Sequence, residues 1–207
     1  MDILASDIGP EATYKLLTGI VVPRPIAWVT TISAAGVVNL APFSAFTFVS
    51  NKPPMVGVNV GRKAGVMKDT GNNILAGGEF VVNIADDTLV EPVHLSAIEY
   101  GPETSEADLL GLATAPSIRV RPPRLEAAPI SMECRLHRAI AFGDTGSQFM
   151  VGEVLLFHIR DGLLENGKID TAKLRPLCRI AGPNYARLGE VLHMTPIAQT
   201  AKTVLSK

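Results

Sequence analysis

Hydrophobic positions along this chain fall in short runs that are rich in β-branched and aromatic residues, and Gly, Pro and Asn separate these runs. Runs of this kind are typical of buried β-strands. They predict strands at 26–33, 37–40, 46–50, 55–60, 79–84, 130–142 and 148–159. The turns at 34–36 and 143–146 would join antiparallel pairs. Many short strands with few helices favour a closed or partly closed β-barrel with small helices attached.

Helical patterns are fewer and shorter, and they predict helices at 11–17, 70–76 and 89–98. We expect Gly19 to end the first helix and Thr70 to act as the N-cap of the second, which Gly77 and Gly78 would end. Residues 100–115 are rich in Gly, Glu and Asp. This composition predicts an exposed excursion from the barrel.

Composition narrows the class of protein. The chain has 207 residues, 47% apolar and 19% charged, with a formal net charge of −1. These values predict one globular domain spanning 1–207. Lys and Arg form no long blocks, so nucleic acid is not the expected partner.

We also expect no membrane partner and a cytoplasmic location, because neither a spanning helix of about 20 predominantly apolar residues nor a secretory leader is visible. Cys134 and Cys178 show no C-x-x-C spacing and are expected to be reduced and buried.

The stretch 23–60 carries no charged residue between Arg24 and Lys52. At its centre, residues 39–46 combine small, apolar and uncharged polar side chains with Pro42. Proline removes a backbone donor, so we expect strand pairing to be disturbed there and neighbouring amides and carbonyls to be available to a ligand. A flat heteroaromatic ligand with several donors and acceptors would suit this segment. The alternative is two core strands joined across an irregular bend.

Common signatures of catalytic or nucleotide-binding sites are missing from the sequence. No two of the four histidines lie three or four residues apart, so no metal site is predicted. There is no G-x-S-x-G elbow, no Rossmann G-x-G-x-x-G opening a helix and no phosphate loop. A cluster of three basic residues and one threonine does follow a core strand at a predicted helix start. Its members are Arg62, Lys63, Lys68 and Thr70. Free amides and cations there would suit a phosphate, and a solvated surface turn is the alternative.

Four segments together carry a resemblance to a known family. They read TTISAAGVVNLAPFSAF, KDTGNNI, EFVVNI and RIAGPNY. In combination they resemble the flavin reductase-like proteins, which are FMN-binding Greek-key split β-barrels, and the resemblance extends from about residue 20 to about residue 196. It implies a mainly β split barrel with a few short peripheral helices. It also implies a homodimer with FMN near the subunit interface.

The resemblance assigns roles to individual residues. The backbone from Asn39 to Ala45 would line the isoalloxazine ring, and Arg179 and Tyr185 would come near the flavin, with residues 174–185 either reaching the partner subunit or folding back on their own barrel. Hydroxyls around the ring and phosphate contacts would complete the cofactor site, which as a whole comprises Thr30, Thr31, Asn39, Ala41, Pro42, Phe43, Ser44, Ala45, Arg62, Lys68, Thr70, Arg179 and Tyr185.

The expected activity is hydride transfer from NADH or NADPH through FMN. This chemistry belongs to the flavin, so the missing acid, base and nucleophile motifs are consistent with it. Two alternatives remain open. One is an FMN-holding electron carrier without a nicotinamide site, and the other is a β-barrel interaction module that binds no cofactor.

Overall fold

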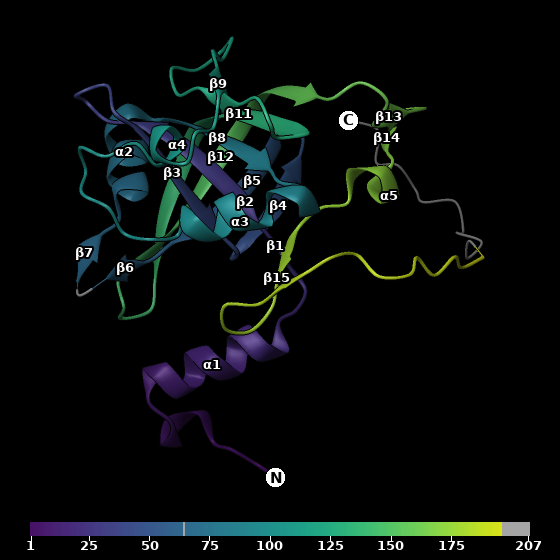
Figure 1. Cartoon of the computed structure of the whole chain (residues 1–207). Helices are drawn as coiled ribbons and strands as arrows, with labels where there is room; N and C mark the ends of the chain where they lie inside the picture. Colours follow the sequence, from purple (N-terminus) through teal and green to yellow (C-terminus); the bar gives the residue numbers. More distant parts are fainter. Residues whose placement is uncertain (64, 196–207) are drawn as a thin grey trace, which may run out of the picture.

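Figure 1 shows a β-barrel with short helices around it, in a computed structural model that describes residues 1–63 and 65–195. The end of the predicted domain, 196–207, lies outside the described residues, as does the side chain of Lys63. Seven strands form the main sheet: β2 (Ala27–Ile32), β3 (Val38–Phe43), β4 (Phe46–Asn51), β5 (Pro54–Val60), β8 (Glu79–Ile84), β11 (Ile130–Phe142) and β12 (Ser147–Ile159). This architecture confirms the predicted mainly β fold, and the bounds of β8 and β11 are those that the sequence predicts.

Smaller elements surround the main sheet. The helices are η1 (Ala5–Asp7), α1 (Pro10–Ile20), α2 (Asp69–Gly77), η2 (Asp87–Leu89), α3 (Val90–Leu95), α4 (Glu106–Leu109) and α5 (Thr171–Leu174). The remaining strands have two residues each: β1 (Arg24–Pro25), β6 (Arg62–Lys63), β7 (Val66–Met67), β9 (Thr114–Ala115), β10 (Arg124–Leu125), β13 (Leu164–Glu165), β14 (Lys168–Ile169), β15 (Cys178–Arg179) and β16 (Tyr185–Ala186). No described helix is long and apolar enough to cross a lipid bilayer.

The order of strands explains why the sheet closes. Across the sheet the order is β3-β2-β8-β11-β12-β5-β4, and all neighbouring pairs are antiparallel. β3 and β4 are therefore the two outer strands, yet only residues 44 and 45 separate them along the chain. The sheet must therefore curl until its two outer strands come close together. We call residues 39–46, where this happens, the barrel seam. Because β3 and β4 are not paired with each other, backbone groups remain available along this seam.

Pro42 does not interrupt β3, contrary to the sequence-based expectation. The strand stays in register with β2 through this residue, with Pro42 opposite Trp28 and Phe43 opposite Ala27. The Leu40 N–H donates away from β2, to the side chain of Glu106, and residues two apart in an antiparallel strand present their backbone groups on the same side. The nitrogen of Pro42 therefore lies on the free edge of β3, where a missing donor costs no ladder hydrogen bond.

Thr70 is not the N-cap of α2. The cap position is Lys68, and no side chain caps the helix, which begins at Asp69. The Thr70 hydroxyl instead accepts a hydrogen bond of 2.9 Å from the Asn39 amide, and both residues are buried. Gly19 also fails to end α1, which continues to Ile20, and α3 is shorter than the predicted 89–98. At Thr70 the weak local capping signal is outweighed by a contact with a distant segment.

Alternate residues of β2 pack into two different cores. Ala27 and Val29 belong to the barrel interior, together with Phe80 and Met150. Trp28, one position along, belongs to a second core formed between the barrel wall and the segments that carry α3, α4 and β10. Both faces of β2 are therefore buried, which explains why its sequence, AWVTTI, contains no charged residue.

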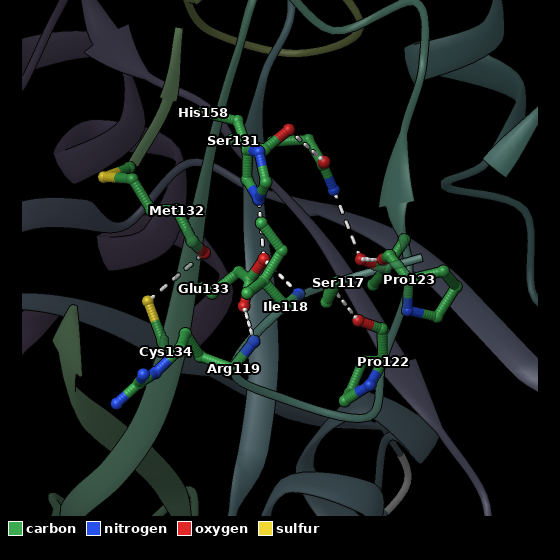
Figure 2. Close-up of polar contacts among 12 residues, drawn as sticks. Ser117, Ile118, Arg119, Pro122, Pro123, Ser131, Met132, Glu133, Cys134 and His158 are labelled. Carbon is green, nitrogen blue, oxygen red and sulfur yellow. Dashed lines mark hydrogen bonds and ion pairs between the residues drawn. The ribbon is translucent and has the colours of Figure 1, made fainter. Parts of the chain in front are cut away.

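A buried carboxylate anchors the long loop before β10. Glu133 on β11 is fully buried, and it accepts hydrogen bonds from the backbone N–H groups of Ile118 (2.8 Å) and Arg119 and from the His158 ring (2.6 Å) (Figure 2). Burial acts to raise the pKa of Glu133, but the His158 and backbone hydrogen bonds outweigh it and lower this pKa below its usual value. This fixes the loop against the barrel, and none of these residues lines the two cavities along the barrel seam that are described below.

Candidate flavin site

Two adjoining compartments lie along the barrel seam and share the residues Pro42, Lys68 and Ala97. The first has a volume of about 420 Å³ and the second about 370 Å³. The first is lined by Asn39, Ala41, Pro42, Val66, Met67, Lys68, Asp69, Thr70, Ser96, Ala97, Ile98, Glu99, Tyr100 and Glu106. The second is lined by Tyr14, Thr18, Arg24, Ile26, Pro42, Phe43, Ser44, Lys68, Ala97, Arg179, Gly182 and Tyr185. Together they form one groove that follows the free edge of β3.

The first compartment sets the edge of β3 against the start of α2. The Asn39–Thr70 hydrogen bond joins these two elements across its floor. The Lys68 ammonium lies 5.9 Å from the centre of the Phe43 ring, between the two compartments. Backbone N–H groups in the first turn of a helix have no partner within that helix, so this end of the compartment offers donors and one cation to an anion.

Glu106 brings a buried carboxylate into the first compartment. It is only 7% exposed, and its Oε2 accepts a hydrogen bond of 2.7 Å from the Leu40 N–H on the free edge of β3. Burial raises the pKa of Glu106 above its usual value, and the Leu40 N–H offsets only part of that effect. The residue therefore joins α4 to the β3 edge. Its position corrects the expectation that all of 100–115 is an exposed excursion.

The second compartment is positively charged. Its lining includes Arg24, Lys68 and Arg179 and contains no carboxylate. Arg24 donates to the Ser44 hydroxyl (3.3 Å) and to three backbone carbonyls, those of Thr18, Val21 and Ile180. These neutral oxygens hold its guanidinium in place without cancelling its charge.

Arg179 and Tyr185 form the other wall of the second compartment. Arg179 donates from Nε to the Gly182 carbonyl (3.0 Å) and from Nη1 to the Tyr185 hydroxyl, and its guanidinium lies 4.6 Å from the Tyr185 ring centre. His94 Nδ1 is 3.2 Å from the same hydroxyl. Burial raises the pKa of Tyr185, and the Arg179 charge opposes but does not cancel this effect. The hydroxyl is therefore neutral at physiological pH.

The structure brings most of the predicted site residues to this groove but not all of them. Asn39, Ala41, Pro42, Phe43, Ser44, Lys68, Thr70, Arg179 and Tyr185 line one or both compartments. The others lie elsewhere. Thr30 donates to the Pro123 carbonyl, Thr31 accepts from Asn73, the Ala45 carbonyl accepts from the Asn59 N–H, and Arg62 donates to the Gly146 and Gly65 carbonyls.

Sequence reasoning missed four charged residues that line the groove, Arg24, Asp69, Glu99 and Glu106, of which Arg24 and Glu106 are the most informative. Arg24 stood out only as the last charge before the uncharged stretch. The short helix that carries Glu106 did have a local signal. Ser105 is followed three residues later by Asp108, which is the pattern of a helix start. The Ser105 hydroxyl indeed accepts from the Asp108 N–H. Within residues 1–63 and 65–195, no group of three or more His, Cys, Asp or Glu side chains is positioned to hold a metal ion.

Comparison with known proteins identifies the family. The model of the family described as "Flavin reductase like domain" matches residues 19–177. The chain belongs to this flavin reductase-like family. A solved structure from Shewanella frigidimarina, named as a flavin reductase with a split barrel domain, matches with a TM-score of 0.83 at 18% identity over 96% of this chain and all of that chain, and so supports the fold.

More similar proteins also match over nearly their whole length. An uncharacterised protein of Halalkalibacterium halodurans is 41% identical, covering 94% of this chain and 95% of that protein. Nitrilotriacetate monooxygenase component B from Bacillus cereus is 39% identical with a TM-score of 0.91, covering 94% and 98% of the two chains. The 2-nitrobenzoate 2-nitroreductase of Pseudomonas fluorescens is 32% identical with a TM-score of 0.83, covering 98% and 100%.

Proposed function

We propose that this protein is an FMN-dependent oxidoreductase that takes hydride from NADH or NADPH. The observation that carries the proposal is the groove along the barrel seam, with the uncharged β3 edge on one side and Lys68 at the start of α2 on the other. The family and the names of the more similar solved structures, a monooxygenase component and a nitroreductase, support a flavin oxidoreductase. Bound FMN would supply the hydride chemistry, and the protein would hold and orient it.

The residues present fit FMN in chemical type. The outer edge of β3 carries carbonyl groups that no neighbouring strand pairs, and these would suit an N–H donor of the flavin ring. Its N–H groups are not available at Pro42, which has none, or at Leu40, which donates to Glu106. Apolar contacts from Val66, Met67 and Ile98 would cover the ring. The first-turn amides of α2, the Thr70 hydroxyl and the Lys68 ammonium would hold the phosphate. We assign Arg62 no contact with FMN, since both of its carbonyl partners lie outside the groove.

A spectrum of the purified protein followed by anaerobic addition of NADH and, separately, NADPH tests this function. We expect the absorbance of bound flavin near the visible maximum of free flavin, and its bleaching by at least one of the two nucleotides. Affinity for FMN should exceed that for riboflavin, and each tenfold preference corresponds to about 1.4 kcal/mol. Binding of FMN without bleaching would favour an electron carrier. If the protein binds neither FMN nor FAD, the result would favour a β-barrel interaction module without a cofactor.

The homodimer expected from the sequence is retained as a proposal, but with a different contact. Residues 174–185 pack on their own subunit, where Leu174 and Leu177 are buried and β15 pairs with β1. Helix α1 has no buried residue, and its Tyr14, Leu17 and Ile20 are more than half exposed. A helix of this length is marginal in water without tertiary packing. We therefore propose that α1 packs against a second copy of the chain.

Light scattering at micromolar concentration tests this assembly. We expect a dimer for the natural sequence and a monomer for Leu17→Asp, because a carboxylate would be buried in the contact. Leu109→Asp, a change at another exposed leucine on α4, serves as the control and should stay dimeric. A natural protein that is monomeric while fully loaded with FMN would contradict the assembly and leave the proposed activity standing.

A further inference from the structure

The two compartments of the groove differ in charge. The first is lined by Asp69, Glu99 and Glu106, with Lys68 as its cation. The second is lined by three cations and no carboxylate. A cavity of one sign of charge concentrates small ligands of the opposite sign. The second compartment therefore selects for an anion.

Arg179 has more unused donors than Arg24, the other guanidinium in this compartment. A guanidinium has five N–H donors, and Arg24 spends four of them on oxygens of this chain. Arg179 spends two, one on the Gly182 carbonyl and one on the Tyr185 hydroxyl. Its three other donors include both N–H groups of Nη2, and the Tyr185 ring packs against the guanidinium plane. The group is thus held in place before any ligand arrives, with a fork suited to two oxygens.

The remaining walls define the body of the ligand. Ile26, Pro42, Phe43 and Tyr185 provide apolar and aromatic surface around the three cations. A volume of about 370 Å³ lies at the small end of ligand sites, near the lower limit of roughly 300 Å³. These dimensions suit a single ring that bears one anionic group better than a dinucleotide.

We propose that the second compartment binds a small aromatic carboxylate, with Arg179 as the residue that anchors the carboxylate. The ligand would lie beside the flavin, since the two compartments share Pro42, Lys68 and Ala97. Its placement as a second substrate rests on the proposed function. Its binding does not, and this allows the two to be tested separately.

Calorimetric titration of the full-length protein with benzoate and with benzamide tests the assignment, because the two differ mainly in charge. We expect benzoate to bind at least tenfold more tightly than benzamide. Arg179→Gln should weaken benzoate binding at least tenfold and leave benzamide binding unchanged, which also shows that the cavity is intact. Arg179→Lys should recover only part of the loss. Arg135→Gln, which removes an exposed partner of Glu153, should change neither titration by more than twofold.

Each contrary result has a definite meaning. Equal binding of the two ligands, or unchanged benzoate binding by Arg179→Gln, would overturn the proposal. Inorganic phosphate that displaces benzoate with equal affinity would assign the compartment to the phosphate of a nucleotide and overturn it as well. The proposal would also be overturned if Arg179→Gln lost FMN binding but kept riboflavin binding, because Arg179 would then bind the FMN phosphate. The titrations are run on FMN-free and FMN-loaded protein, so a protein that binds benzoate but no FMN would refute the proposed function alone.

Discussion

Two polar regions of this molecule use similar side chains for different purposes. Around Glu133 the carboxylate is fully buried and accepts three hydrogen bonds, from the His158 ring and from the Ile118 and Arg119 N–H groups (Figure 2). Along the groove, Arg179 keeps unused donors and the outer edge of β3 has no neighbouring strand. Satisfied polar groups rigidify a fold, whereas accessible unsatisfied ones are available to a ligand. The pairing of a polar residue therefore indicates its role better than its type does.

The largest expected effect is on folding stability, through the hydrogen-bond network around Glu133. Glu133→Ala would leave two backbone N–H groups and the His158 ring without their acceptor. Each buried donor left unsatisfied costs about 1–3 kcal/mol, so the three together should cost roughly 3–5 kcal/mol. We expect a loss of this size in the free energy of unfolding, measured by denaturant titration. Glu153→Gln, at an ion pair whose Arg135 partner is exposed, should cost at most about 1 kcal/mol. A loss for Glu133→Ala as small as that of the control would show that the network is not structurally important.

Acid should weaken the same network more gently. The pKa of Glu133 is lowered on folding, so its contribution to stability is fully present above its unfolded pKa. That contribution is lost as pH falls through the lower, folded pKa. The free energy of unfolding should therefore decrease on the acid side of the ordinary glutamate pKa of about 4.3. In Glu133→Gln this decrease should be smaller, and identical acid profiles for the two proteins would contradict the assignment.

An effect on binding rather than on folding is expected in the groove. If Lys68 makes a charge-assisted contact with the FMN phosphate, Lys68→Ala should lose roughly 1.5–3 kcal/mol of FMN binding. Its folding stability should hardly change, because the side chain is exposed. Lys52→Ala, at an exposed lysine outside both compartments, is the matched control for titrations with FMN and riboflavin. Equal FMN affinity in both variants would mean that Lys68 belongs to a solvated surface turn and does not bind the phosphate.

The Asn39–Thr70 hydrogen bond lies between these two extremes, since it is buried yet lines the groove. Thr70→Val should cost about 1–2 kcal/mol of folding stability, because the Asn39 amide loses its acceptor. In Asn39→Leu/Thr70→Val both partners are apolar, so the combined loss should be smaller than the sum of the single losses. Strict additivity in this double-mutant cycle would mean that the bond contributes no coupling.

The sequence predicted those parts of the molecule whose causes are local. The bounds of β8 and β11 follow from apolar runs ended by turn residues, and the motif at the barrel seam identified the β3 edge of the groove. The charge of the second compartment was not predictable in this way. Arg24 and Arg179 are 155 positions apart in the numbering and meet only because β1 pairs with β15. Likewise, Glu106 becomes a groove residue only through its bond to Leu40, 66 residues away.

The smallest predicted effect concerns Arg62, which the sequence placed in the same basic cluster as Lys68. The hairpin of β6 and β7 separates the two, and Arg62 Nε donates to the Gly146 carbonyl at 2.8 Å while Nη1 donates to the Gly65 carbonyl at 3.1 Å. Gly146 has a φ of +70°, and a Cβ there would come within 2.8 Å of Arg62 Cδ, so the arginine stem packs directly on this glycine.

Arg62→Ala should therefore change FMN binding by less than about 0.5 kcal/mol, the usual range for a surface substitution away from a site. The measurement is the same titration as for Lys68→Ala, so the two variants can be compared directly. A loss equal to that of Lys68→Ala would require Arg62 to release both carbonyls when the flavin binds. Because neither Gly65 nor Gly146 lines the groove, such a loss would also show that the Arg62 side chain turns toward the cofactor.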